Sequence, residues 1–410
     1  MVLLAACLSS RASSGAGKDL VADNYSLPFT FFWEWGDHTP PYPFEPPAPF
    51  VLRRGGPKNN HTELTISQQW GRWPMPYSGR GGQRAPGAPG LFLQGGVPQS
   101  PQANLSLHLQ DFVAGIDGLR KGELQGLPRD FDGNAVIDME AWSSVWELNG
   151  CPERCSSPVQ PLSRALVRGR HPGLNASELE RRAKEDFEDA ANRWMVATLQ
   201  LGRRLRPRAH WGYYGVPAKI YAPCTEGPGG GWRCGYDHPS QGAQFRRWSD
   251  ALSPVVGAST ALYPSLYVAG ADSWPEEGQA GAAARNRAWI GAVVREAVRI
   301  GRGRPVLPYA WSYYANLSES GVCLALSSDD QDSELLAPYD AGAAGVVLYA
   351  DAEKRVCPVA FKTLTFGTIA PRLQAFMHRV RACAEANCTE HGRCMPLGGR
   401  NCSSPAPGRQ

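Results

Sequence analysis

The sequence contains no long hydrophobic run, and no apolar stretch approaches the roughly 18–20 residues that a membrane-spanning helix needs. Neither sign of charge is in large excess, because the 42 Lys and Arg nearly balance the 38 Asp and Glu and leave a formal net charge of +4. This balance neither requires a nucleic acid nor excludes a polyanionic partner. The chain also lacks a Gly-x-Ser-x-Gly elbow, a His-Glu-x-x-His helix and a Walker loop. We therefore expect no metal, no cofactor, no nucleic acid partner and no transmembrane segment.

Aromatic residues and loop formers, by contrast, are plentiful. The 410 residues include 13 Trp, 14 Tyr and 13 Phe, which is enough for a large hydrophobic core and excludes a disordered chain. Gly and Pro number 45 and 35, well above their usual joint share of about 12%. Residues 37–101 are rich in both and are predicted to form long ordered loops between short strands. The composition predicts one large domain of catalytic size with a small appendage.

Cysteine usage and glycosylation motifs indicate the secretory pathway. One of the 11 Cys, Cys7, lies in residues 1–17, a short apolar stretch followed by small residues that resembles a signal peptide without a basic start. Its removal would leave ten Cys, an even number that suits disulfides. Seven residues head an Asn-x-Ser/Thr triplet and are candidate glycan acceptors: Asn24, Asn60, Asn104, Asn175, Asn316, Asn387 and Asn401. No hydrophobic tail follows Cys402, so nothing indicates a lipid anchor, and we expect a secreted or lysosomal protein.

Helical and extended patterns alternate from residue 102 onward. The predicted helices are residues 105–119, 177–204, 282–301 and 363–382, and the predicted buried strands are 135–137, 261–268, 305–310 and 345–349. In the clearest helix, Ser177 is the expected N-cap and an apolar stripe runs from Phe187 to Leu199. Such alternation predicts an α/β fold with a parallel sheet, either open or closed.

The ends of the predicted strands favour the closed sheet. No Gly-rich phosphate loop follows the first strand, which argues against an open nucleotide-binding sheet. Polar or aromatic residues stand at several strand ends: Asp138, Glu140, Tyr214, Tyr267 and Tyr349. Active-site groups gathered from several strand ends are typical of a (β/α) barrel. We predict a distorted (β/α) TIM-like barrel.

The last segment has a different composition, because Cys383, Cys388, Cys394 and Cys402 lie within 20 residues. Such density cannot support an apolar core and predicts a unit held by disulfides. We interpret residues 381–410 as the beginning of an EGF-like module, truncated because its Cys set is incomplete. A zinc site is the alternative, but the single nearby His391 and the secretory context argue against it.

Two acids follow the first predicted strand. Residues i and i+2 of a strand face the same side, so Asp138 and Glu140 point together while Met139 points away. Two neighbouring carboxyl groups cannot both ionise easily, so one keeps its proton and can serve as a general acid. The alternative is two solvated acids at a strand end. Trp142 and Trp146 favour the catalytic interpretation, since aromatic walls suit sugar rings and desolvate a carboxyl group.

Two other charged patterns carry less weight. A calcium loop starting at Asp130 is rejected, because its Gly falls at the fourth position rather than the sixth and Ala141 occupies the twelfth, where Glu belongs. An arginine cluster comprises Arg203, Arg204, Arg206 and Arg208. It indicates either a solvated helix end or a surface that steers an acidic polymer.

The segment Ala135–Trp142, with sequence AVIDMEAW, closely resembles the catalytic signature of the animal hyaluronidases, glycoside hydrolase family 56. Further blocks resemble the family in its own order: Gly95–Gln99, residues 164–217, Ala261–Tyr267, Pro305–Tyr309 and Gly342–Tyr349. Together they extend over about residues 27–394 and look most like the vertebrate members. The resemblance implies a catalytic barrel in residues 18–380. It also implies a retaining, substrate-assisted mechanism, an exception to the scheme with a carboxylate nucleophile.

The resemblance also implies roles for individual residues. Glu140 would protonate the glycosidic oxygen and later act as base on water, while the substrate's N-acetyl carbonyl is the nucleophile. Asp138 would share a proton with Glu140 and help to position the acetamide. The implied substrate-binding residues are Tyr77, Tyr214, Tyr267, Tyr309 and Tyr349. Among them, Tyr214 and Tyr267 would hydrogen-bond the acetamide or the carboxyl group, although tyrosines at strand ends are otherwise interpreted as packing.

Several positions depart from the family pattern. Met139 stands where members usually have Trp, Ser143 where Arg is common, Tyr349 where Trp is usual and Ala315 where Asp is expected. These departures leave the acid pair intact but put affinity and substrate preference in question.

The candidate disulfide cysteines are Cys224, Cys234, Cys323, Cys357, Cys383, Cys388, Cys394 and Cys402. Cys224 and Cys234 are close enough in sequence to bridge a loop. Residues 34–38 lack a Cys that the family has, and the resemblance then implies that Cys357 pairs with Cys323 instead. Spacing alone does not fix the connectivity.

By this resemblance the chain is a monomeric endo-β-N-acetylhexosaminidase that hydrolyses β-1,4 linkages of hyaluronan, with chondroitin as a further substrate. Two alternatives stay open. One is a member that prefers chondroitin, and the other is a hyaluronan-binding glycoprotein with weak or no turnover that adheres through its cleft and EGF-like segment. The intact Asp138 and Glu140 favour the enzyme, whereas Ser143 and Tyr349 keep the binding protein open.

Overall fold

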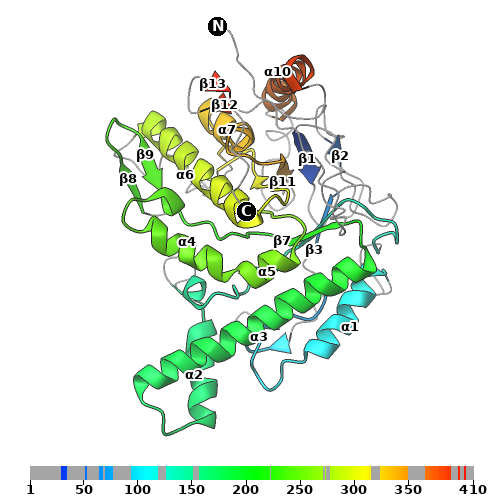
Figure 1. Cartoon of the computed structure of the whole chain (residues 1–410), viewed down its shortest axis with the longest axis vertical. Coiled ribbons are helices and arrows are strands. Elements are labelled where there is room, and N and C mark those ends of the chain that lie inside the picture. The colour runs from blue at the N-terminus through cyan, green and yellow to red at the C-terminus, as the bar shows by residue number, and fades with distance from the viewer. Residues whose placement is uncertain are drawn as a thin grey trace.

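The central feature of the fold is a series of parallel strands with helices around it (Figure 1). The structure, a computed structural model, describes residues 29–34, 51–52, 64–67, 70–76, 94–118, 126–150, 157–221, 223–270, 273, 278–314, 324–349, 365–388, 396–397 and 401–402. The strands are β1 Thr30–Glu34, β2 Val51–Leu52, β3 Leu64–Ser67, β4 Pro74–Met75, β5 Gln94–Gly95, β6 Asn134–Ile137, β7 His210–Tyr213, β8 Cys224–Glu226, β9 Trp232–Cys234, β10 Tyr309–Ala310, β11 Gly345–Tyr349, β12 Pro396–Leu397 and β13 Asn401–Cys402. The helices are α1 Leu105–Ile116, η1 Trp146–Asn149, α2 Val159–Arg170, α3 Ala176–Leu205, η2 Gly235–Asp237, α4 Gly242–Ala251, α5 Ser253–Ala258, α6 Gly278–Gly301, α7 Ser328–Leu335, α8 Ala337–Asp340, the π-helical turn η4 Thr365–Ile369 and α10 Ala370–Cys388.

The pairings of the central strands are all parallel. One sheet has the order β3-β6-β7 and the other β10-β11-β1-β2. The two sheets are joined by three parallel bridges: Tyr214–Tyr263, Leu262–Val306 and Ser265–Tyr309. Starting from β3, neighbouring strands follow the order of the chain through β6, β7, the bridged segment, β10 and β11. β1 and β2 come next to β11, and β1 also contacts β3, where the series began. The predicted parallel α/β alternation is confirmed, and its cyclic order is that of a TIM-like barrel.

Two predicted strands are shorter than their apolar runs. Residues 261–268 form isolated bridges instead of a continuous strand, and within 305–310 only Tyr309–Ala310 has regular strand geometry. The cause is proline, since Pro264, Pro305 and Pro308 have no N–H to donate to a sheet ladder. The Pro264 carbonyl still accepts a hydrogen bond from the Tyr309 N–H at 2.8 Å, so the parallel alignment survives.

The predicted helices are present, with shifted ends. α1 ends at Ile116, α6 begins at Gly278, and α10 continues to Cys388 after a π-helical turn. The prediction that Ser177 caps the long helix is wrong, because Asn175 is the N-cap of α3. Its Oδ1 accepts the Glu178 N–H, and the Glu178 carboxylate accepts the Asn175 N–H, both at 3.0 Å. This reciprocal capping box satisfies two backbone donors and starts the helix two residues earlier.

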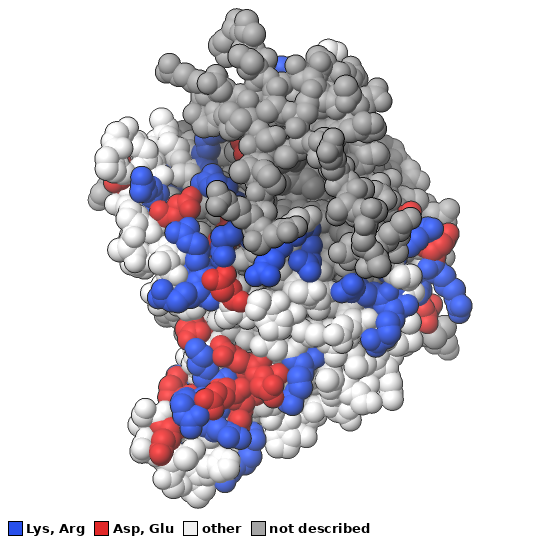
Figure 2. All heavy atoms as spheres, in the orientation of Figure 1, with Lys and Arg blue, Asp and Glu red and all other residues white. Residues whose placement is uncertain are grey.

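The arginine cluster at the end of α3 stabilises the fold. Arg206 is only 4% exposed, and its guanidinium donates to the Leu127 carbonyl and to Asp117. Arg203 donates to the Ala258 carbonyl, and Arg208 donates to the carbonyl of Asp130. Figure 2 shows acidic and basic side chains interspersed over the lower part of the molecule, where α2 and α3 lie. These contacts support the helix-end interpretation of the cluster over the steering surface.

Gly212 in β7 tests how tightly the sheet is packed. A Cβ built there would run into the Ala261 carbonyl oxygen and lie 2.9 Å from the ring of Tyr263. We expect Gly212→Ala to lower the free energy of unfolding by about 1–3 kcal/mol, because a closely packed backbone must shift. Urea unfolding measures this change. The matched control is Gly169→Ala on the exposed face of α2, where nothing lies within 4 Å of the added Cβ. An equal loss in both variants would contradict the packing argument.

The C-terminal part contains α10 and the antiparallel pair β12 and β13. Cys383 on α10 is disulfide-bonded. Within the described ranges, no helix combines the length and the apolar character that crossing a bilayer requires.

Candidate active site

The acid pair lies at the carboxyl end of β6. The strand itself is fully buried, whereas Asp138 is half-buried and Glu140 is exposed. Met139 between them is only 5% exposed, so the predicted alternation across the strand end is confirmed. The Oδ1 atom of Asp138 is shielded from solvent. The arrangement presents one carboxyl group to an incoming molecule and a second, partly desolvated one beside it.

Tyr214 is held next to the acid pair by the neighbouring strand. Its N–H donates to the Ile137 carbonyl at 3.1 Å, which places Tyr214 beside Asp138 at the ends of β7 and β6. Its hydroxyl donates to the Ser265 Oγ at 3.1 Å. Main-chain and side-chain bonds thus fix the ring at the rim of the sheet.

Three more predicted tyrosines gather around Tyr214. The ring of Tyr267 lies 6.2 Å from that of Tyr214 and stacks on Trp311 at 4.1 Å with an interplanar angle of 8°. The ring of Tyr309 lies 5.2 Å from Tyr214 and 6.5 Å from Tyr349. The sequence therefore identified residues that the fold brings together from the end of β7, from β10 and β11, and from the segment 261–268. We name Tyr214, Tyr267, Tyr309 and Tyr349 the tyrosine cluster.

The four rings differ in accessibility. Tyr214 and Tyr349 are half-buried, and Tyr267 is 8% exposed. Tyr309 is 0% exposed, so its predicted contact with substrate is corrected: it lies beneath Tyr214 as packing. Tyr77 and Ala315 are outside the described residues.

Electrostatic coupling connects the tyrosine cluster to the acids. Burial raises the pKa of the Tyr214 hydroxyl, and the negative charges of Glu140 and, less strongly, Asp138 raise it further. Burial likewise raises the pKa of Tyr267 well above its ordinary value, with a smaller contribution from Tyr214. Both hydroxyls therefore stay protonated at neutral and acidic pH. Two neutral hydroxyls therefore lie near the acid pair, and that of Tyr214 donates to the Ser265 Oγ.

The two tryptophans after the acid pair do not form the predicted aromatic wall. Trp142 is 1% exposed and donates its indole N–H to the Pro74 carbonyl at 2.7 Å. Trp146 is 5% exposed and donates its indole N–H to Glu180 at 3.1 Å. Both are core anchors, and neither offers a ring face of sugar size to solvent.

The loop after Glu140 is fixed by a residue that the sequence did not single out. Asn149 is 1% exposed; its Oδ1 accepts the Ser143 N–H at 2.8 Å, and its Nδ2 donates to the carbonyls of Ser143 and Val145. The Trp146 N–H donates to Glu188 at 2.8 Å. Ser143, which replaces a basic residue of the family pattern, is thus part of a bonded turn. Asn149 follows Glu147 and Leu148 in a mixed stretch, and the sequence held no signal that singled it out.

Glu334 on α7 is a second residue that sequence reasoning missed. It is 0% exposed, and its two carboxyl oxygens accept the N–H groups of Val268 at 3.0 Å and Trp311 at 2.8 Å. These backbone groups adjoin Tyr267 and carry its stacking partner. Burial raises the pKa of Glu334 well above its ordinary value, opposed by the two N–H donors and by the charge of Lys219. By accepting both N–H groups, the Glu334 carboxyl group holds together the chain segments at Val268 and Trp311, which support the tyrosine cluster.

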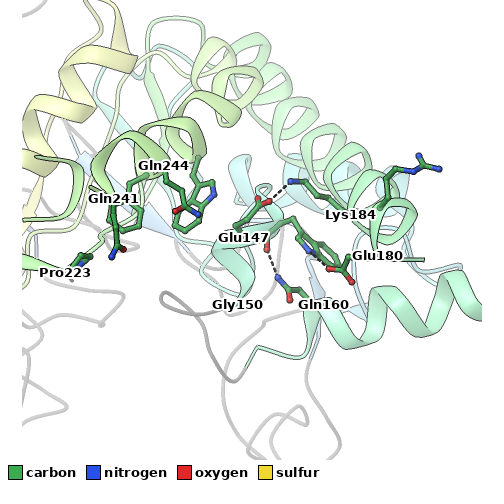
Figure 3. A pocket seen from close by; sticks show the side chains of 12 residues that line it. Glu147, Gly150, Gln160, Glu180, Lys184, Pro223, Gln241 and Gln244 are labelled. Carbon is green, nitrogen blue, oxygen red and sulfur yellow. Dashed lines mark hydrogen bonds and ion pairs between the residues drawn. The ribbon is translucent and has the colours of Figure 1, made fainter. Parts of the chain in front are cut away.

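A pocket of about 910 Å³ opens between η1, α3 and α4 (Figure 3). Gln241 and Gln244 lie on one side and Glu147 and Lys184 on the other, with Lys184 and Glu147 ion-paired. Because η1 follows β6 and α4 follows β7, the pocket opens at the carboxyl end of the sheet, as the acid pair does. Its described lining includes neither the acids nor the tyrosine cluster, so it is a separate hollow on the same rim.

One predicted disulfide is present, between Cys224 in β8 and Cys234 in β9, with an S–S distance of 2.06 Å. Cys388 lies on α10 and Cys402 on β13, while Cys323, Cys357 and Cys394 are outside the described residues.

Two predicted glycan acceptors are well placed on the surface. Asn104 and Asn175 are exposed N-caps of α1 and α3. Asn387 is on α10 and Asn401 on β13; Asn24, Asn60 and Asn316 lie outside the described residues.

Sequence comparison with known proteins identifies similar chains. The family model described as Hyaluronidase, glycoside hydrolase family 56, matches residues 87–400. Human Hyaluronidase-1 is 34% identical over 308 residues, covering 73% of this chain and 64% of the human protein. Chondroitin hydrolase of Caenorhabditis elegans is 33% identical over 174 residues, covering 42% of this chain and 33% of that protein. The chain thus spans less than two thirds of the length of the human, bovine and porcine Hyaluronidase-1 proteins that it matches.

Solved structures share the fold. A crystal structure of bee venom hyaluronidase matches with a TM-score of 0.56 and 23% identity, covering 88% of this chain and 99% of that one. Its complex with a hyaluronic acid tetramer matches with a TM-score of 0.54 and 25% identity, covering 80% and 86%. The parallel, ring-ordered sheet described above is therefore shared with bee venom hyaluronidase.

Proposed function

This chain belongs to the hyaluronidase family, and we propose that it is an endo-β-N-acetylhexosaminidase that hydrolyses the β-1,4 linkages of hyaluronan. The observation that carries the proposal is the acid pair: an exposed Glu140 and a half-buried Asp138 at the end of a buried strand, beside protonated tyrosines. The bee venom relative, whose complex holds a hyaluronic acid tetramer, supports the choice of polymer.

In the proposed reaction, Glu140 enters protonated and gives its proton to the glycosidic oxygen as the bond to C1 breaks. The carbonyl oxygen of the adjacent acetamide attacks C1 and closes an oxazolinium ring, so the substrate supplies the nucleophile. Water then attacks C1 from the other face, loses a proton to Glu140 and reopens the ring, which retains the configuration at C1.

Asp138 and the tyrosines act on the acetamide. The Asp138 carboxylate faces the acetamide N–H and balances the positive charge of the oxazolinium ring. Tyr214 is the proposed donor to the acetamide: burial and the nearby acids raise its pKa and keep its proton in place, and on substrate binding that proton would turn from the Ser265 Oγ to the acetamide. Tyr267, braced by Trp311, limits the movement of the sugar at the same subsite. Positioning by fixed groups lowers the entropic part of the barrier.

Chondroitin is the second candidate substrate. The similarity to a chondroitin hydrolase of Caenorhabditis elegans supports it, as do the departures at Ser143 and Tyr349. Hyaluronan and chondroitin both present an N-acetylhexosamine to the same acid pair. A binding glycoprotein with little turnover stays the third possibility.

Reducing-end release from purified hyaluronan and chondroitin, in parallel and from acidic to neutral pH, tests the proposal. We expect release from hyaluronan, with a pH profile that reports the ionisation of the acid pair. Release from chondroitin alone would change the substrate. No release from either polymer by the folded, glycosylated protein would contradict the hydrolase and favour the binding glycoprotein.

A secretory location fits this substrate, since hyaluronan and chondroitin are polymers of the cell exterior and its degradative compartments. The Cys224–Cys234 disulfide and the exposed Asn104 and Asn175 support it, because structural disulfides are rare in the cytosol. We further propose that residues 381–410 form an EGF-like segment and that the protein acts as a glycosylated monomer.

A further inference from the structure

Lys219 lies on the wall of the tyrosine cluster. It follows β7 by a short segment that includes the cis peptide bond Val216–Pro217. Its ammonium nitrogen is 5.8 Å from the ring centroid of Tyr267 and 5.5 Å from that of Tyr221. Cations within about 6 Å of a ring centroid are attracted by the negative face of the ring. The side chain is half-buried, so these two rings position the ammonium group beside the tyrosine cluster.

The charges around Lys219 come from several elements. Glu334 on α7 is buried and accepts the N–H of Val268, the residue after Tyr267, and the charge of Lys219 lowers its pKa against the effect of burial. Asp138 and Glu140 are near Tyr214, whose pKa they raise. Lys219 therefore contributes positive charge beside Glu334, Asp138 and Glu140, three acids of the described residues. The rings of Tyr221 and Tyr267 and the buried Glu334 carboxyl group surround the Lys219 ammonium group.

The proposed substrate needs a cation at this wall. Hyaluronan and chondroitin alternate an N-acetylhexosamine with a hexuronate, so the sugar next to the reacting acetamide carries a carboxylate. The acid pair would repel that carboxylate, and residues 139–150, which follow Asp138, contain no Lys or Arg. A tyrosine hydroxyl brings no positive charge to a carboxylate, whereas an ammonium group adds an ion pair to its charge-assisted hydrogen bond.

We propose that Lys219 is a specificity-determining residue whose ammonium group binds the hexuronate carboxylate adjacent to the N-acetylhexosamine at Glu140. The inference rests on the proposed function and adds the recognition of the second sugar of the repeat. Lys219 recognises the acidic sugar and Glu140 acts on the linkage. Tyr267 lies beside Lys219, and its ring is 6.2 Å from that of Tyr214, the tyrosine coupled to Glu140. The group that Lys219 recognises is a carboxylate on a sugar ring, and both candidate polymers carry it.

The test compares Lys219→Met with wild type on hyaluronan and on carboxyl-reduced hyaluronan, in which each hexuronate is a neutral hexose. We expect Lys219→Met to raise KM for hyaluronan at least about tenfold with little change in kcat, because uniform binding is lost. KM for the carboxyl-reduced polymer should not change. Lys219→Arg should restore much of the affinity, since it keeps the charge. Arg287→Met, which removes one cation paired with Asp340 on another face, should match wild type.

Direct binding keeps the inference testable apart from turnover. Calorimetry with hyaluronan and carboxyl-reduced oligosaccharides should show a loss in Lys219→Met for the acidic ligand alone, even if the wild type cleaves neither polymer. That pattern without turnover would refute the proposed hydrolase and keep the role of Lys219. An equal loss for both ligands, an unchanged affinity for hyaluronan, or no binding of either ligand to wild type would overturn the role of Lys219.

Discussion

Replacing Glu140 with Gln should remove nearly all release of reducing ends from hyaluronan while leaving the fold and the affinity for the polymer intact. The amide has the shape of the carboxyl group but cannot give up or accept the proton that the reaction needs. General acid–base groups contribute about 10²–10⁴-fold, and because one residue serves both steps we expect a loss of kcat of at least about 10³-fold. Because Glu140 is exposed, the substitution leaves no buried group without a partner.

The same strand supplies the matched control for this variant. Asp132 precedes β6 at its amino end, is exposed, and lies 3.6 Å from Arg208. Asp132→Asn makes the same chemical change at the opposite end of the strand and should leave kcat within about twofold of wild type, as expected for a surface pair of little energetic weight. Circular dichroism and calorimetry with hyaluronan oligosaccharides check fold and binding. Turnover that survives Glu140→Gln would assign the proton transfer to another group.

Much of this site could be predicted from sequence, because strand geometry is simple. The period of two placed Asp138 and Glu140 on one side of the strand end and Met139 on the other, as the structure has them. The ends of parallel strands meet at one edge, so Tyr214, Tyr267 and Tyr349 converge although they are far apart along the chain. Local strand geometry determines the first arrangement, whereas the second follows from the parallel sheet, and the role of these tyrosines in binding came from the resemblance to the family.

The parts that could not be predicted depend on three-dimensional packing. The sequence does not show whether an aromatic residue after a strand faces solvent or the core, and Trp142 is buried against the Pro74 carbonyl. Nor does it show that Glu334, on a short polar helix, turns both carboxyl oxygens toward buried N–H groups from two distant segments. Arg206 is similar, since its carbonyl partner at Leu127 is remote in sequence.

Glu334→Leu should destabilise the protein more than a typical surface or conservative substitution, and it should also reduce turnover. Leucine has similar volume but no acceptor, so the N–H groups of Val268 and Trp311 lose their partners in the core. Each buried donor left without an acceptor costs about 1–3 kcal/mol, which gives a loss of about 2–6 kcal/mol in the free energy of unfolding. Because Trp311 supports Tyr267, kcat should fall as well.

Two further variants separate the hydrogen bonds of Glu334 from other effects. Glu334→Gln retains one acceptor oxygen and should lose about half as much stability as Glu334→Leu. Asp332→Ala on the same helix breaks a partly exposed pair with Arg372 and should cost no more than about 1 kcal/mol. Urea unfolding gives all three values. If Glu334→Leu costs no more than Asp332→Ala, the carboxyl group does not hold the two strand ends.

The charge of Glu334 adds a pH dependence whose direction is fixed by its burial. Burial raises the pKa of Glu334 in the folded protein above its value of about 4.3 in an unfolded chain. Between these two pKa values the folded state holds a proton that the unfolded state has lost, so stability from this group falls as pH rises through that window. Above the folded pKa the contribution is constant. Glu334→Gln has no such proton, so the decline in unfolding free energy with rising pH should be smaller in this variant than in wild type. An identical pH dependence in the two proteins would mean that the carboxyl group has the same proton affinity folded and unfolded, and its hydrogen bonds to Val268 and Trp311 would then fully offset its burial.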